Sequence, residues 1–151
     1  MKQAVALVVY RDDTHEQVLS VLRPEDDDDH PGMWGLPATS LRDDEDWLDA
    51  VHRAAQKKLG VQVVSGELVS EGEQEREDYT IVLRNYRVSI NGDPDVDQDA
   101  DGTTYEDWTW KPVSAMQETA EEGDSLCTSL LLDRHGIAFD RDDDIVRMEQ
   151  F

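Results

Sequence analysis

The sequence contains little lysine, almost no cysteine and no long apolar run. Its four lysines are Lys2, Lys57, Lys58 and Lys111, and its one cysteine, Cys127, excludes an internal disulfide framework. No stretch approaches the about 18 consecutive apolar residues of a membrane-spanning helix, and the N-terminus lacks the pattern of a signal peptide. We therefore expect no membrane span and, by default, a cytoplasmic location.

Basic residues are too few to balance the acidic ones. The chain carries 36 aspartate and glutamate residues against 14 lysine and arginine residues, which gives a formal net charge of −22 at pH 7. This balance argues against nucleic-acid binding, which requires basic patches. It is typical of proteins in molar salt, where the screening length falls to about 3 Å and self-repulsion is suppressed. We therefore expect a halophilic source, and we interpret the acidic runs at 26–29, 93–101 and 142–144 as solvated surface.

Several common site motifs are also absent. The sequence holds no glycine-rich phosphate loop, no Cys-x-x-Cys pair and no His-Glu-x-x-His motif. What remains is one long patterned stretch, residues 33–61, in which a turn-rich loop leads into a helical pattern. The candidate chemistry must therefore be sought there.

The helical pattern has a start, an apolar face and an end. Asp46 stands where an N-cap oxygen is wanted, and Gly60 stands where a left-handed C-cap is expected. Apolar residues between them recur at helical spacing, which predicts one buried face. The residues of this face are Trp47, Leu48, Val51, Ala54, Ala55 and Leu59.

Apolar patterns elsewhere predict strands and further helices. The expected strands are 3–10, 17–23, 61–69, 78–90 and 103–111, and the expected helices are one beginning near residue 114 and one over 124–134, capped by Asp124. We expect the first two strands to pair as a hairpin. An acidic tail from about residue 137 is left open between a short strand, a contact with a neighbouring subunit and a loose end. The order indicates one domain over the whole chain, 1–151, with an α+β fold.

The patterned stretch resembles the Nudix box of the Nudix hydrolase (MutT-like) family. Trp34, Leu36 and Pro37 match the family's Trp-x-Leu-Pro lead-in, Glu45 falls on its loop glutamate, and Arg53 falls on its helix arginine. The resemblance covers about thirty residues at the level of motif and the whole chain at the level of element order. It implies a Nudix-type α/β/α sandwich with a mixed β-sheet.

The metal-binding part of this box is degenerate. In the family, the helix carries an Arg-Glu-x-x-Glu-Glu run whose glutamates hold the divalent metals that activate water and clamp a diphosphate. The corresponding residues here are Ala54, Lys57 and Lys58. Mg²⁺ requires hard oxygen ligands, and an ammonium group repels a divalent ion. We therefore expect no metal on this helix, with ligation by Glu45 left open and with Mg²⁺ as a cofactor only if the protein is active.

Two interpretations of Lys57 and Lys58 remain open. The preferred one is a solvated helix end that suits the helix dipole. In the other, an ammonium group replaces the metal and holds a ligand phosphate directly. Arg23, at the end of the second expected strand, and Arg53 would then add metal-free phosphate contacts. Trp34 completes the candidate ligand-binding residues, although packing at the base of the loop is the preferred role of its ring.

Three functions follow, in order of preference. The first is a catalytically impaired binder or sensor of a nucleoside diphosphate-linked ligand. The second is an active Nudix pyrophosphohydrolase with a rewired metal site and Glu45 as its catalytic residue, and the third is a protein-interaction scaffold. The further carboxylates considered for a rewired site are Asp43, Asp44, Glu71, Glu73, Glu75 and Glu106. The expected partner is a small nucleotide-like molecule, not nucleic acid or a membrane, and a homodimer is left open.

Overall fold

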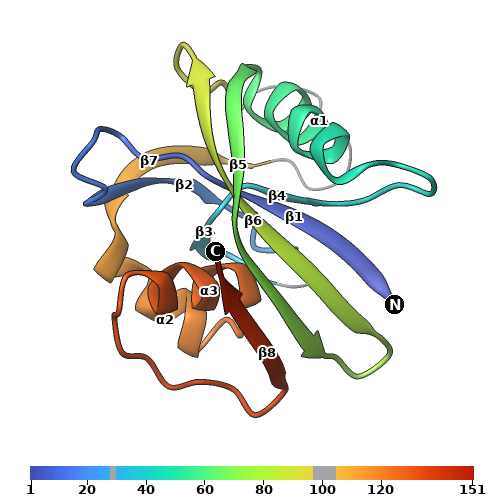
Figure 1. Cartoon of the computed structure of the whole chain (residues 1–151). Coiled ribbons are helices and arrows are strands. Elements are labelled where there is room, and N and C mark those ends of the chain that lie inside the picture. The colour runs from blue at the N-terminus through green and yellow to red at the C-terminus, as the bar shows by residue number, and fades with distance from the viewer. Residues whose placement is uncertain (28–29, 97–104) are drawn as a thin grey trace.

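A mixed five-stranded sheet forms the centre of the molecule (Figure 1). The computed structural model describes residues 1–27, 30–96 and 105–151. The strand order is β4-β1-β6-β5-β8, and β1 and β6 are parallel whereas the other neighbours are antiparallel. In that order the strands are β4 (Ala38–Ser40), β1 (Lys2–Val8), β6 (Thr80–Asn91), β5 (Gln62–Glu75) and β8 (Ile145–Gln150).

A smaller three-stranded sheet lies beside the first. It has the order β3-β2-β7 and consists of β3 (Trp34–Gly35), β2 (Gln17–Leu22) and β7 (Asp107–Pro112). The expected hairpin between the first two strands forms only next to its turn. There Tyr10 and Val18 form an antiparallel bridge, the Leu19 amide donates to the Val9 carbonyl at 2.8 Å, and the Arg11 amide donates to the Gln17 carbonyl at 3.1 Å. Elsewhere the expectation is wrong, because β1 is flanked by β4 and β6 while β2 pairs with β3 and β7.

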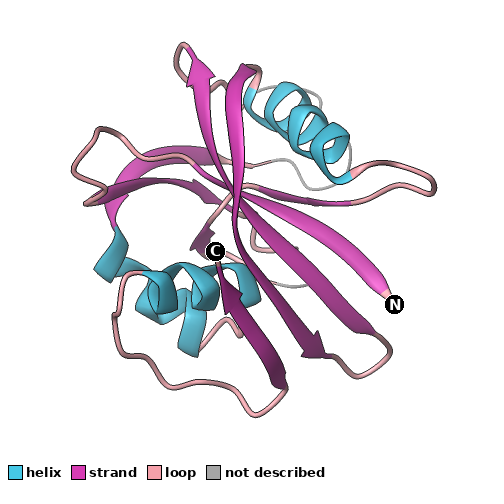
Figure 2. Ribbon diagram, in the orientation of Figure 1, coloured by secondary structure: helices cyan, strands magenta, loops and turns pink. Residues whose placement is uncertain are grey.

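Helices cover both faces of the large sheet, as Figure 2 shows. They are α1 (Trp47–Leu59), a short 3₁₀ turn η1 (Val113–Met116), α2 (Gln117–Glu121) and α3 (Leu126–Arg134). Alternate side chains of β1 point to opposite faces. Val5 and Leu7 pack with α1, whereas Ala4 and Ala6 pack with α3. This arrangement confirms the predicted α+β sandwich with a mixed sheet between helices.

Helix α1 has the predicted ends. Asp46 stands at the N-cap position, but its side chain makes no capping hydrogen bond, contrary to the expectation of a capping oxygen. Gly60 adopts the left-handed conformation at φ 64° that ends the helix, as predicted. Val51, Ala54 and Ala55 of the predicted face are buried together with Leu59, but Leu48 is 51% exposed. The expectation for Leu48 is therefore wrong, because its side chain, in the first turn of α1, faces solvent rather than the sheet.

Two other boundaries differ from the expectation. The strand expected over 61–69 does not end there but continues as β5 to Glu75, with bulges that absorb the irregular register. Helix α3 is capped by Ser125, whose side chain accepts a hydrogen bond from the Thr128 amide, and not by Asp124. No helix in the described parts of the chain is long and apolar enough to cross a membrane.

Candidate ligand-binding cavity

A cavity of about 420 Å³ opens on the α3 face of the large sheet, at its β4 edge. The β1 and β6 strands supply its apolar floor through Ala4, Ile81 and Leu83, and the first turn of α3 supplies a wall through Leu126 and Cys127. Helix α1 lies against the other face of the sheet but sends two long basic side chains to the cavity. A pocket of this size accommodates a small organic ligand.

The charge of the cavity is opposite to that of the molecule. Six lining residues are basic, and no described lining residue is aspartate or glutamate. The six are Lys2, Arg23, Arg42, Arg53, Lys58 and Arg76. They account for six of the 14 basic residues in a chain of net charge −22. Such a gathering of cations around a concave surface favours an anionic ligand.

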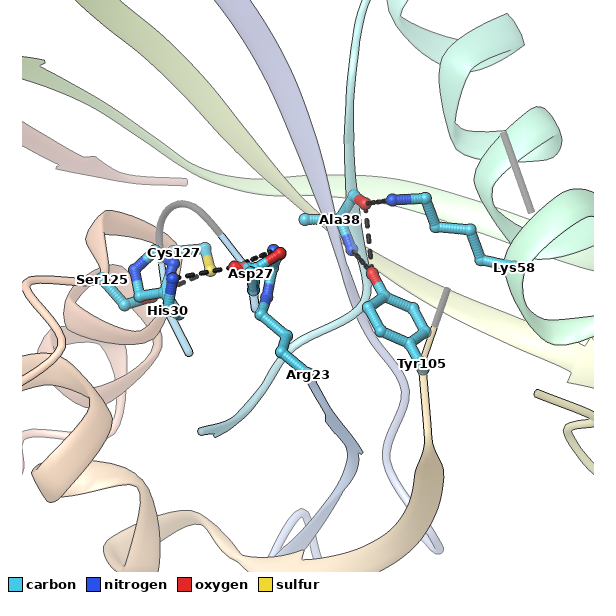
Figure 3. A network of polar contacts seen from close by, with 8 residues as sticks. All are labelled: Arg23, Asp27, His30, Ala38, Lys58, Tyr105, Ser125 and Cys127. Atoms are coloured by element: carbon cyan, nitrogen blue, oxygen red, sulfur yellow. Dashed lines mark hydrogen bonds and ion pairs between the residues drawn. The ribbon is translucent and has the colours of Figure 1, made fainter. Parts of the chain in front are cut away.

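Lys58 is the most buried of these cations. It is 6% exposed, and its Nζ donates a 2.7 Å hydrogen bond to the Ala38 carbonyl and lies 5.3 Å from the centre of the Tyr105 ring (Figure 3). Among the described residues, none brings a carboxylate within ion-pair distance of this ammonium group. Burial, and then the charges of Arg23 and Arg53, lower the pKa of Lys58 from 10.5 to about 8.

The two adjacent lysines therefore have different environments. Lys57 is exposed on the last turn of α1, as the preferred interpretation predicted. For Lys58 that interpretation is wrong, because the helix turns its side chain under β4 and into the cavity. The structure thus places one ammonium group, rather than two, where the alternative interpretation puts a ligand phosphate.

Arg53 is fixed by the loop that precedes its helix. Its guanidinium forms two 2.9 Å hydrogen bonds to the Glu45 carboxylate and a 2.7 Å bond to the Ser40 carbonyl. The hydrogen bonds from Arg53 lower the pKa of Glu45 to about 2, helped by the Arg42 amide and opposed by burial. Glu45 therefore serves as the counter-ion that orients Arg53, and it does not itself line the cavity.

Arg23 lines the cavity opposite α1. Its guanidinium lies 3.4 Å from Asp27 and 5.9 Å from the centre of the Tyr105 ring. Figure 3 shows Arg23 and Lys58 approaching the same region from different elements, with Tyr105 and Ala38 between them. The Tyr105 hydroxyl accepts from the Ala38 amide and donates to its carbonyl, which holds the β4 edge in place.

Trp34 does not belong to this site. The Trp34 ring is not part of the cavity lining and faces Lys111, whose Nζ lies 5.0 Å from the ring centre. This geometry agrees with the packing role. His30, for which the sequence indicated no site role, is half-buried and lines the cavity, and its backbone amide donates a 2.8 Å hydrogen bond to the Asp27 carboxylate.

Other cavity residues gave little signal in the sequence. Lys2 and Arg42 stand at the exposed rim, and Arg76 follows β5 in a segment predicted as a polar connection. Nothing in their spacing relates them to α1. Their contribution depends on how the strands assemble, which local patterns do not encode.

The α1 surface does not fit a divalent metal ion. Of the three positions that hold glutamate in the resembling family, Ala54 is buried without a polar group, Lys57 points to solvent, and Lys58 presents donors only. Both oxygens of Glu45, the remaining carboxylate of the box, already accept a hydrogen bond from Arg53, and one of them also accepts from the Arg42 amide. We derive no catalytic step through a metal at this helix.

The other carboxylates considered for a metal site lie elsewhere. Glu71 is bonded to Arg84 and Arg147, and Glu73 also approaches Arg147. Glu106 is exposed ahead of β7, and none of these three is part of the cavity lining. By spacing from Trp110, a glutamate that often precedes this strand in the resembling family would fall near Thr104, which lies outside the described residues. Asp43, Asp44 and Glu75 are exposed and are also not part of the lining.

Comparison with known proteins relates the whole arrangement to one family. The family model described as NUDIX domain matches residues 1–130. None of the curated proteins compared with this chain matches it.

Solved structures with the same fold include two hydrolases and the NUDIX domain of another protein. The MutT NUDIX hydrolase from Burkholderia pseudomallei is 18% identical, with 87% of this chain and 95% of that chain covered and a TM-score of 0.66. An Ap4A hydrolase from C. elegans, in a binary complex, is 15% identical, with 90% and 96% covered and a TM-score of 0.66. The NUDIX domain of Shewanella oneidensis NrtR, complexed with ADP ribose, is 21% identical, with 76% and 74% covered and a TM-score of 0.56. At such low sequence identities, the structural similarity shows that the fold is shared.

Proposed function

Because this chain belongs to the NUDIX domain family, we propose that it binds a nucleoside diphosphate-linked ligand in its basic cavity without a metal ion, as a binder or sensor with impaired catalysis. In this function Lys58, Arg53 and Arg23 contact the phosphates. The apolar floor of β1 and β6 receives the rest of the ligand.

The observation that carries the proposal is the burial of Lys58 with no carboxylate of the described residues within ion-pair distance of its ammonium group. Burying an ammonium group without an ion-pair partner costs free energy. A phosphate group entering the cavity would supply the missing negative charge and accept hydrogen bonds from Lys58 and the arginines. The site thus has the composition of a preformed anion receptor.

The residue changes on α1 support impaired catalysis. Metal-assisted attack on phosphorus needs carboxylates that hold the ion and stabilise developing charge. The residues at these positions cannot do so, and Glu45 is engaged by Arg53. An open cavity of about 420 Å³ also favours a ligand-binding role over a scaffold, whose pocket would be filled by side chains.

The ligand class can be tested with two compounds named by the structural relatives. We expect ADP-ribose or diadenosine tetraphosphate to raise the melting temperature of the protein in EDTA and molar KCl. Lys58→Met should weaken binding by about tenfold or more, because a charge-assisted hydrogen bond is lost. Lys57→Met, which removes the neighbouring exposed ammonium group, is the matched control and should leave affinity unchanged.

A hydrolysis assay separates the binder from an active enzyme. The same compounds are incubated with the protein and Mg²⁺ in molar KCl, and product is measured. Turnover that disappears in Glu45→Gln would contradict the proposal and favour a rewired metal site. Absence of both turnover and binding for the whole compound class would instead favour a scaffold.

The surface charge supports a proposal about the setting in which the protein works. We propose that the chain comes from a halophile and acts in a cytoplasm rich in salt. A net charge of −22 is costly in dilute buffer and is screened in concentrated salt.

A further inference from the structure

Three carboxylates converge away from the basic cavity. Asp124 lies in the turn between α2 and α3, and Asp142 and Asp144 lie in the loop before β8. One carboxylate oxygen from each residue lies within 4.8 Å of the others, and all three residues are half-buried. The run 142–144 was expected to be solvated surface, yet the fold brings Asp142 and Asp144 close to Asp124, which belongs to another segment. Like charges at this spacing repel unless a cation lies between them.

A buried amide points to the same place. Gln74, on β5, is fully buried, and its Nε2 donates a 2.7 Å hydrogen bond to Asp124. Its Oε1 has no hydrogen-bond partner among the described residues, which is a costly state for a buried oxygen. A half-turn of the terminal amide exchanges the two atoms. It would aim the oxygen at the carboxylates, an arrangement that a cation lying between them stabilises.

We propose that Asp124, Asp142 and Asp144, with the side-chain oxygen of Gln74, bind a hard divalent cation such as Ca²⁺ or Mg²⁺. These ions take carboxylate and amide oxygens as ligands, and water from the exposed side completes the coordination sphere. Arg76, the nearby cation that also lines the basic cavity, offsets only part of the negative charge. The site does not depend on the function proposed for the cavity, and none of its four ligands lines that cavity.

The position of the site gives the cation a structural role. Asp124 directly precedes Ser125, which caps α3 and lines the basic cavity. Asp142 and Asp144 lead into β8, which pairs with β5 beyond the last residue matched by the family model. A bound ion therefore connects the final strand to the turn that forms one wall of the cavity.

Calorimetric titration of the EDTA-treated and dialysed full chain with CaCl₂ or MgCl₂ in constant KCl tests the site. We expect one ion per chain and a cation-dependent rise in melting temperature. Asp142→Asn combined with Asp144→Asn should weaken binding by about tenfold or more, since charged ligands set affinity. Asp143→Asn is the matched control, because Asp143 lies between the two ligands but is exposed. Its affinity should stay within about twofold of the native value, since only a non-ligand charge is lost.

The remaining outcomes each decide the matter. No saturable binding of either ion, or equal weakening by Asp143→Asn and the double variant, would overturn the proposal in favour of non-specific screening. Gln74→Met keeps the length of the buried side chain but removes the amide oxygen. Its circular dichroism reports folding, and in a folded variant an unchanged cation affinity would remove Gln74 from the ligand set.

Discussion

At the scale of single residues, Lys58 combines a cost to folding with a use in binding. Its ammonium group is buried, donates to a backbone carbonyl and lies near two arginines. Residues that break the ordinary rules of burial in this way are frequent at functional sites. The same feature therefore yields opposite expectations for stability and for affinity.

Lys58→Met should stabilise the ligand-free protein by about 1 kcal/mol, because an unpaired buried charge is replaced by an apolar side chain of similar length. In this variant the Ala38 carbonyl still accepts a hydrogen bond, since the Tyr105 hydroxyl donates to it. The folded pKa of Lys58 lies below the unfolded value, so the penalty is complete below about pH 8 and fades toward pH 10.5. Chemical denaturation should show the largest difference between variant and native protein near neutral pH, and a loss of stability at that pH would contradict the assignment.

Affinity for an anionic ligand should fall as the pH rises through the pKa of Lys58, about 8. Below this pH the group is an ammonium ion, and above it a neutral amine that attracts a phosphate less. Between about pH 7 and about pH 9 the loss should approach tenfold if the bound phosphate keeps Lys58 protonated. Arginine side chains are not deprotonated in proteins, and burial raises the pKa of Tyr105 away from this range. In Lys58→Met the calorimetric affinity should be flat with pH, and a slope that persists would assign the effect to another group.

At the scale of elements, the loop before α1 and the helix itself are joined by the Glu45–Arg53 pair. Glu45→Gln should lower the free energy of unfolding by about 1 kcal/mol near neutral pH, because a paired carboxylate becomes a neutral amide. The folded pKa of Glu45 is depressed, so this stability is present above about 4.5 and is lost as the pH falls through about 2. Denaturation curves of the two proteins should converge in acid. Equal stability at neutral pH would show that the loop holds Arg53 without this bond.

Helix α1 could be predicted from the sequence because its signals are local. Asp46, the apolar spacing and Gly60 lie within one stretch, and the helix has those ends. The resemblance to the Nudix box likewise identified Arg53 and Lys58 as candidate ligand-binding residues. The pairing of β2 could not be predicted in this way, because its partner β7 lies about ninety residues further along the chain.

The parts of the site that come from loops were not predictable for the same reason. His30 belongs to an acidic segment with the composition of exposed surface, and only its packing over α3 brings it to the cavity. Arg76 could be placed at the cavity only if the full length of β5 were known. The bulges in β5 interrupt the alternation of side chains from which that length would be predicted. The acidic residues at 142–144 show the converse error, since composition alone cannot distinguish solvated aspartates from converging ones.

At the scale of the whole molecule, charge is unevenly distributed. Cations gather in the cavity and in small networks such as Arg147 with Glu71, Glu73 and Glu149, while the remaining surface is strongly acidic. The net repulsion acts against the compact state. Salt should therefore affect this protein more than it affects a neutral domain of the same size.

Raising KCl from about 0.1 M to about 2 M should increase the melting temperature, because the screening length falls from about 10 Å to a few ångströms. NaCl at equal concentration should act in the same direction, whereas an uncharged osmolyte of equal osmolarity should give a smaller rise. Calorimetric scans in each solution provide the measurement. A melting temperature that falls with KCl would contradict the interpretation of the acidic surface as an adaptation to salt.

Cys127, the one sulfhydryl of the chain, is 8% exposed and borders the basic cavity. A maleimide reagent that enters the cavity meets this sulfur in the space that a ligand would fill. Bound nucleotide should therefore shield the Cys127 sulfur and slow its alkylation. The alkylation rate of the unmodified protein thus reports whether the cavity is occupied.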